Sequence, residues 1–129
     1  KTSMYSLHPP NWAIIVDVTS TDDCEGKNTK ILGKGPCLTI KDAEIMTNRK
    51  INEHIKAIAK KVRIPLQLEV AEKGTTDAAS ISVFRGGIPS SIISIPIRNI
   101  HTTSSIVHKK DIEKTITLIE NVVKKPILF

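Results

Sequence analysis

The spacing of apolar side chains divides the chain into short strands and amphipathic helices. Apolar runs at residues 12–16, 37–40 and 91–95 are short and rich in Ile and Val, which is typical of buried strands, and Pro96 breaks the last of them. Apolar and polar residues alternate at 66–70, which indicates a strand near the edge of a sheet with one wet face. The pattern therefore predicts four strands.

Three segments have the period of a helix. The first can be capped by Thr47 or Asn48, and its apolar stripe is Ile51, Ile55, Ile58, Ala59 and Val62. The second begins near Thr76 or Asp77 and is predicted to end near Arg85, before a glycine pair. The third covers residues 111–123, with the expected stripe Ile112, Ile116, Ile119, Val122 and Val123.

Polar segments separate these elements. Residues 1–11 are expected to be extended, and 18–30 to form a long loop after the strand that carries Asp17. The two glycines of 33–36 are suited to a tight turn. Strands alternating with helices in this way predict an α/β fold, a three-layer sandwich with a mixed central β-sheet flanked by helices.

Composition narrows the class of protein. The chain has 129 residues, enough for one domain, and no apolar run long enough to span a membrane. We expect a soluble, intracellular protein, and the Lys-rich, Ile-rich composition favours a heat-adapted source. The net charge of +6 raises nucleic-acid binding as an alternative, but the lysines are scattered and aromatic residues are few. Cys24 and Cys37 have no metal-binding spacing and are predicted to be free thiols.

Two strands are followed by side chains that commonly bind metals. Asp17 ends one apolar run, and His101 follows another. In open α/β sheets ligands bind beyond the carboxyl ends of the strands, so the two residues raise a metal or acid–base hypothesis. The alternative for His101 is a histidine that caps a loop.

The segment 72–80 is a second candidate site. It contains a glycine and threonine turn followed by Asp77 and small residues, so helix amides and a carboxylate could receive an anion or an amine. The alternative is that Thr76 or Asp77 is only the N-cap of a helix.

Taken in order, several segments resemble a known family. They are AIIVDVTSTDD, LGKGP, IPLQLEV, GTTDAAS, RGGIPSSIISIP and RNIHTTSSIVHKKDIEKT, and they cover nearly the whole chain. Together they resemble the dizinc aminopeptidases that assemble into tetrahedral dodecamers, which include glutamyl and deblocking aminopeptidases and some relatives labelled endoglucanase. No paired carboxylates placed to flank a glycosidic bond support that last label.

The resemblance implies a site with two divalent ions, zinc or cobalt, that activate water to remove amino-terminal residues from peptides. Asp17 and His101 match the ligands of one metal, while the other metal's ligands, the bridging aspartate and the general base match positions before residue 1. By the same resemblance Gly74, Thr76 and Asp77 lie near the substrate, and Asp23 matches an acidic loop position. We therefore expect residues 1–129 to be the carboxyl-terminal part of a catalytic domain, in which this chain supplies no catalytic base.

The sequence also departs from the family pattern. Thr75 and Ala79 stand where glycine is usual, Asn99 where tyrosine is usual, and Ser105 where an acidic residue is usual. These changes leave open an inactive paralogue or assembly subunit that keeps the fold. The resemblance further implies a cytoplasmic homo-oligomer that binds peptides and neither nucleic acid nor membranes.

Overall fold

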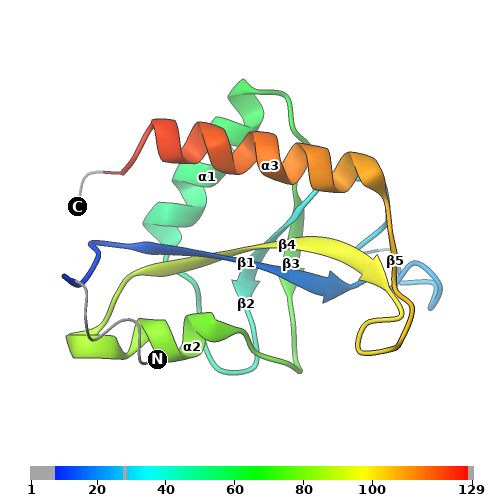
Figure 1. Cartoon of the computed structure of the whole chain (residues 1–129), viewed down its shortest axis with the longest axis horizontal. Helices are drawn as coiled ribbons and strands as arrows, with labels where there is room; N and C mark the ends of the chain where they lie inside the picture. Colours follow the sequence, from blue (N-terminus) through cyan, green and yellow to red (C-terminus); the bar gives the residue numbers. More distant parts are fainter. Residues whose placement is uncertain (1–7, 28, 128–129) are drawn as a thin grey trace.

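The computed structural model describes residues 8–27 and 29–127, so most of the predicted extended segment 1–11 lies outside the described residues. Its elements follow the order β1 (Ala13–Ser20), β2 (Cys37–Lys41), α1 (Arg49–Lys61), β3 (Gln67–Val70), α2 (Asp77–Ser82), η2 (Phe84–Gly86), β4 (Ser90–Arg98), β5 (Ile106–Val107) and α3 (Lys109–Lys124). Helices α1 and α3 lie on one side of the sheet and α2 on the other, as Figure 1 shows. The predicted three-layer α/β sandwich is confirmed.

The sheet is mixed, with strand order β1-β4-β2-β3. Strand β4 runs parallel to β1 and antiparallel to β2, which is in turn parallel to β3. The short strand β5, which the sequence pattern did not predict, pairs with the end of β4. Strand β4 is therefore central, in agreement with its continuous apolar character.

Pro96 does not end β4, contrary to the prediction. The main chain of β4 alternates between its two neighbours, and the carbonyl of Ile97 faces β1, because it accepts the amide of Thr21 at 2.9 Å. The nitrogen of Pro96 therefore faces the other side, where pairing with β2 ends at Ser94 and pairing with β5 begins at Ile97. A residue without an N–H is tolerated in this gap between two partners.

The main core lies between the sheet and the pair α1 and α3. It contains Leu38 and Ile93 from the strands, and the helices add Ile51, Ile55, Ile58, Ala59, Leu118 and Val122. Asn48 caps α1 as predicted, accepting the amide of Ile51 at 3.1 Å.

The predicted stripe of α3 was wrong by about one position. The helix buries Asp111, Thr115, Leu118 and Val122, whereas Ile116 and Val123 are exposed. The buried carboxylate of Asp111 explains this rotation, because it accepts the amides of Gly33 at 2.6 Å and Gly35 at 2.8 Å. Both glycines have positive φ, as the predicted turn requires.

Strands β1 and β3 also differ from the sequence pattern. Strand β1 continues to Ser20, so Asp17 lies within the strand and not at its tip. In β3, Leu68 and Val70 are 53% and 68% exposed, whereas Glu69 is buried. The face of β3 that was predicted to be exposed to solvent therefore faces the interior. Strand β3 is an edge strand, as predicted.

On the side of α2, the sheet is only partly covered. Ala78 and Ile81 of α2 pack against Ile15 and Ile92 of β1 and β4. The rest of this face forms the floor of a pocket, to which polar side chains of four strands contribute. Among the described residues no helix is long and apolar enough to cross a membrane.

Candidate functional site

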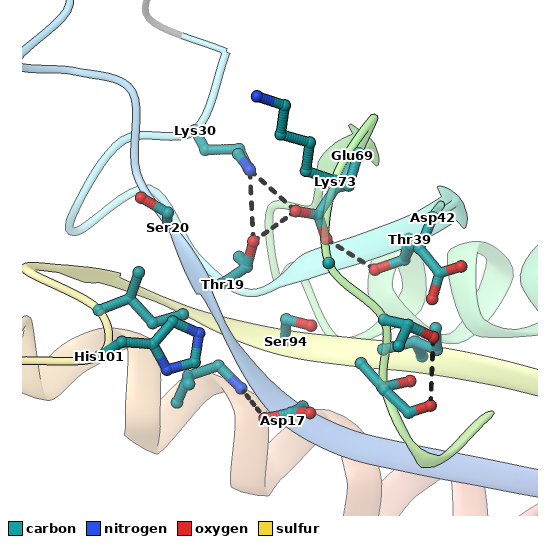
Figure 2. A pocket seen from close by; sticks show the side chains of 17 residues that line it. Asp17, Thr19, Ser20, Lys30, Thr39, Asp42, Glu69, Lys73, Ser94 and His101 are labelled. Carbon is teal, nitrogen blue, oxygen red and sulfur yellow. Dashed lines mark hydrogen bonds and ion pairs between the residues drawn. The ribbon is translucent and has the colours of Figure 1, made fainter. Parts of the chain in front are cut away.

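The pocket on the open sheet face has a volume of about 380 Å³. Residues of β1, β2, β3 and β4 form its floor, and the segments after β3 and β4 form its rim. Side chains two positions apart along a strand point to the same face, which is why Asp17 and Thr19 both reach the pocket. Figure 2 shows the labelled polar side chains gathered around this space.

Asp17 and His101 both line the pocket and lie at the same end of it (Figure 2). Asp17 pairs in register with Ser94 of β4, and its Oδ1 accepts the amide of Val18 at 2.8 Å. His101 comes from the turn after β4, where its side chain is exposed at the rim. Two candidates that are 84 positions apart in the sequence therefore meet in one cavity.

The turn that presents His101 has a special backbone. Asn99 and His101 both have positive φ, at 56° and 61°, a conformation in which Asn and His are enriched among residues other than glycine. The carbonyl of Asn99 accepts the hydroxyls of Thr102 at 2.7 Å and Ser105 at 3.0 Å. These bonds close the turn and fix the direction in which the imidazole leaves the main chain. Asn99 and Ser105 are two of the four positions at which the sequence is expected to differ from the family pattern.

The centre of the pocket floor is a buried ion pair. Glu69 is 4% exposed and its carboxylate accepts Lys30 Nζ at 2.9 Å. The hydroxyl of Thr39 donates to its other oxygen at 2.7 Å, and that of Thr19 donates to the same oxygen as Lys30. Burial alone would raise the pKa of Glu69, but these bonds together outweigh it and hold the pKa below its usual value. Glu69 is therefore a fully partnered carboxylate that ties the loop carrying Lys30 to the sheet.

Asp42 lies at the other end of the pocket, just after β2 (Figure 2). Its Oδ1 accepts the amides of Glu44 at 2.8 Å and Ile45 at 2.9 Å, which closes a turn. Its Oδ2 is buried and, among the described residues, is the one buried side-chain polar atom without a hydrogen-bond partner. A buried, unpaired carboxylate oxygen is costly and needs an explanation.

The structure brings some of the other predicted residues to the pocket and not others. Gly74 and Thr76 line it, and Thr76 is also the N-cap of α2, because its side chain accepts the amide of Ala78 at 3.2 Å. Asp77 is exposed in the first turn of α2 and is not part of the pocket lining. The predicted N-cap alternative therefore describes Thr76 correctly, and Thr76 also lines the pocket.

Asp23 also lies away from the pocket lining. Its carboxylate forms a bidentate ion pair with Arg98, at 3.1 Å to Nε and 2.9 Å to Nη2, and accepts the amide of Leu32 at 3.3 Å. The Arg98 guanidinium is the largest cause that holds the pKa of Asp23 well below its usual value. This geometry fixes the loop after β1 to the end of β4.

The donors of Asp17 and His101 are suited to a divalent ion. A carboxylate oxygen and a neutral imidazole are ordinary zinc or cobalt ligands, and the structure gives the His101 side chain no hydrogen bond within residues 8–27 and 29–127. In the same part of the chain, no group of three or more His, Cys, Asp and Glu side chains is placed to hold a metal. The two residues fit part of a metal site and cannot complete one alone.

Glu69, Lys30 and Asp42 were missed by sequence reasoning. The alternation at 66–70 predicts that its polar positions face solvent, whereas Glu69 is buried. Lys30 was counted as a loop residue, and Asp42 stands in a short polar segment without a motif. Only the register of the four strands brings these positions together.

The α/β sandwich of this chain is similar to the folds of solved peptidases. An aminopeptidase from Desulfurococcus kamchatkensis is 32% identical with a TM-score of 0.90, and the match covers 97% of this chain and 37% of that one. A TET1 peptidase of Pyrococcus horikoshii, titled as able to assemble into a tetrahedron or an octahedral shell, is 27% identical with a TM-score of 0.79, covering 93% and 35%. A solved structure from Thermotoga maritima described as an endoglucanase is 28% identical with a TM-score of 0.71, covering 95% of this chain and 36% of that one.

Sequence comparison identifies the family. Residues 1–118 match the model described as M42 glutamyl aminopeptidase, so the chain belongs to this family. A lysyl aminopeptidase of Pyrococcus furiosus is 35% identical over 112 residues, which are 84% of this chain and 32% of that protein. The chain thus spans about a third of the length of the relatives it matches.

Proposed function

We propose that residues 1–129 form the carboxyl-terminal part of the catalytic domain of a metal-dependent aminopeptidase. The observation that carries the proposal is the meeting of Asp17 and His101 in one pocket, at the positions where the family resemblance expects metal ligands. In this proposal the two residues hold one of two divalent ions. The remaining donors and the general base have to come from outside the described residues.

In the proposed site the metal pair would supply an activated water and polarise the scissile carbonyl. The chain's own residues orient the ligands and the substrate. The turn at Asn99 directs the imidazole of His101, and the amide of Val18 fixes one oxygen of Asp17. In this proposal Gly74 and Thr76, which line the pocket, contact the peptide.

Metal content and activity of the intact polypeptide test this proposal. We expect about two zinc or cobalt ions per chain and hydrolysis of aminoacyl p-nitroanilides that is lost on chelation. His101→Ala and Asp17→Asn should each remove activity and lower metal content. His8→Ala, which changes an exposed histidine away from the pocket lining, is the control. Unchanged turnover in His101→Ala would refute the assignment.

The second candidate is an assembly subunit without activity. The departures at Thr75, in the pocket lining, and at Asn99, at the base of the His101 turn, favour considering it. A protein that assembles, contains no stoichiometric metal and hydrolyses no anilide would support this candidate.

We also propose that the polypeptide forms a homo-oligomer, a dodecamer by resemblance, in line with the assemblies described for the Pyrococcus horikoshii relative. Light scattering coupled to size-exclusion chromatography measures the mass directly. A monomer at micromolar concentration would contradict it.

A further inference from the structure

We propose that Asp42 is the specificity-determining residue of this pocket and that it receives a basic side chain, an alkylammonium or guanidinium group, from the amino-terminal residue of the substrate. The proposal rests on the aminopeptidase function above and adds a substrate class to it. It starts from the unpaired Oδ2 of Asp42, whose partner oxygen is fully used by two main-chain amides.

The charges of the other pocket residues favour a cation at the end of the pocket where Asp42 lies. Lys30 is 16% exposed and its ammonium is balanced by Glu69 at 2.9 Å. Lys73 also lines the pocket, but its side chain is exposed and Figure 2 shows its ammonium directed away from Asp42. Asp42 is 3% exposed, so its negative charge is poorly screened and is not balanced by an ion pair within residues 8–27 and 29–127. A cationic ligand group would supply both the charge and the missing donor.

The distance between the two ends of the pocket favours a long side chain. Asp17 is in register with Ser94, Thr39 is in register with Ile92, and Asp42 follows Thr39 by three residues. At about 3.3 Å per residue, Asp42 therefore lies roughly 15 Å along the strands from the row of Asp17. For a substrate amine held near Asp17 and His101, this distance excludes short side chains and favours the longest ones, those of lysine and arginine.

The lining between the two ends also suits an aliphatic stem. Ile92 and Ala71 contribute apolar atoms, and Thr39 contributes a side chain whose hydroxyl is already bound to Glu69. A lysine or arginine stem can pack here while its charged head reaches the far end. Oδ2 is shielded from water in this structure, so the proposal requires the pocket lining to move when the head group binds.

The test compares Asp42→Asn with wild type in the intact polypeptide, using Lys, Arg, Leu and Glu p-nitroanilides. Asparagine keeps an oxygen that can accept the amides of Glu44 and Ile45, and it replaces Oδ2 and the negative charge with an NH2 donor. We expect kcat/KM for the Lys and Arg substrates to fall about ten- to a hundredfold, the range for a lost hydrogen bond to a charged group, with little change for Leu. Glu44→Gln, an exposed carboxylate two positions away, is the matched control and should change neither.

An equal loss for all four substrates would show a structural role, and an unchanged ratio of Lys to Leu would overturn the proposal. A binding measurement separates this failure from a failure of the aminopeptidase function. Titration calorimetry with L-lysinamide and L-norleucinamide compares side chains of similar length with and without the ammonium. Preferential binding of lysinamide that Asp42→Asn abolishes supports the basic subsite even if no anilide is hydrolysed, and equal binding of the two amides refutes it.

Discussion

The ion pair between Glu69 and Lys30 should be one of the strongest single contributions of the pocket to stability. Glu69→Gln keeps the shape of the side chain and removes its charge. The amide oxygen can still accept Thr19 and Lys30, and the amide nitrogen can donate to the hydroxyl of Thr39, which then accepts. The main loss is therefore the charge that balances Lys30, whose ammonium stays mostly buried.

The expected size of the effect follows from this burial. Removing one partner of a buried ion pair costs about 3–5 kcal/mol, and the partial exposure of Lys30 favours the lower end, about 3 kcal/mol. With an unfolding entropy of about 2.1 cal/mol/K per residue, this corresponds to a decrease in Tm of about 10 °C for a chain of 129 residues. Lys30→Met leaves Glu69 unbalanced instead and should have a similar effect.

A double-mutant cycle followed by circular dichroism measures the coupling. We expect the double variant to lose much less stability than the sum of the single variants, with a coupling free energy of about 2 kcal/mol or more. The control cycle uses Glu53 and Lys56, which form an exposed ion pair at nearly the same distance, 3.0 Å. Its coupling should stay below about 1 kcal/mol. If the two cycles give the same coupling, burial is not the source of the effect and the reasoning is refuted.

Three further predictions concern the stability of the fold and its dependence on pH. Asp111→Asn should lower the free energy of unfolding by about 2–4 kcal/mol in urea titrations, because one of the two glycine amides loses its acceptor, while the exposed Glu113→Gln should have little effect. Because its folded pKa is lowered, Glu69 stabilises the fold fully above its ordinary pKa of 4.5 and loses this contribution as the pH falls through the folded value; Glu69→Gln should flatten the acid side of the Tm profile, and an unchanged slope would contradict this. Gly35→Ala should destabilise strongly, by about 3 kcal/mol or more, since its Cβ would lie 2.3 Å from a main-chain oxygen, whereas Gly26→Ala, with open space and a similar φ, should cost about 1 kcal/mol in the same melts.

Local signals predicted most of the elements. The cap of α1 at Asn48, the turn between Gly33 and Gly35, and the apolar run of β4 each depend on residues close in sequence, and the structure confirms them. The end of β1 was missed because residues 18–20 combine polar and β-branched side chains, which also occur in loops. Pairing with β4, a segment more than seventy positions later, keeps them in the sheet.

The faces of α3 and β3 could not be predicted for a related reason. Periodicity places apolar residues inward, but Asp111 is drawn into the core by two amides of a distant turn, and Glu69 by Lys30 and two threonines. Within the candidate site, Asp17 and His101 were predicted because their residue types and the family resemblance point to metals, and both line the pocket. Asp42 has neither signal, and it stands out only through a missing partner in three dimensions.

In β3 the apolar side chains face solvent and the polar ones face the interior, which has a practical consequence for mutational scanning and for attempts to make the protein more soluble. Replacing Leu68 or Val70 with lysine removes exposed apolar surface at the edge of the sheet and should be tolerated, although a hydropathy plot marks both residues as interior. Substitutions of their polar neighbours Gln67 and Glu69 should be poorly tolerated. The side chain of Gln67 forms hydrogen bonds with the main chain of Ile31 and Gly35, and Glu69 forms the ion pair with Lys30. Along this strand, tolerance to substitution should run opposite to the hydrophobicity of the native residue.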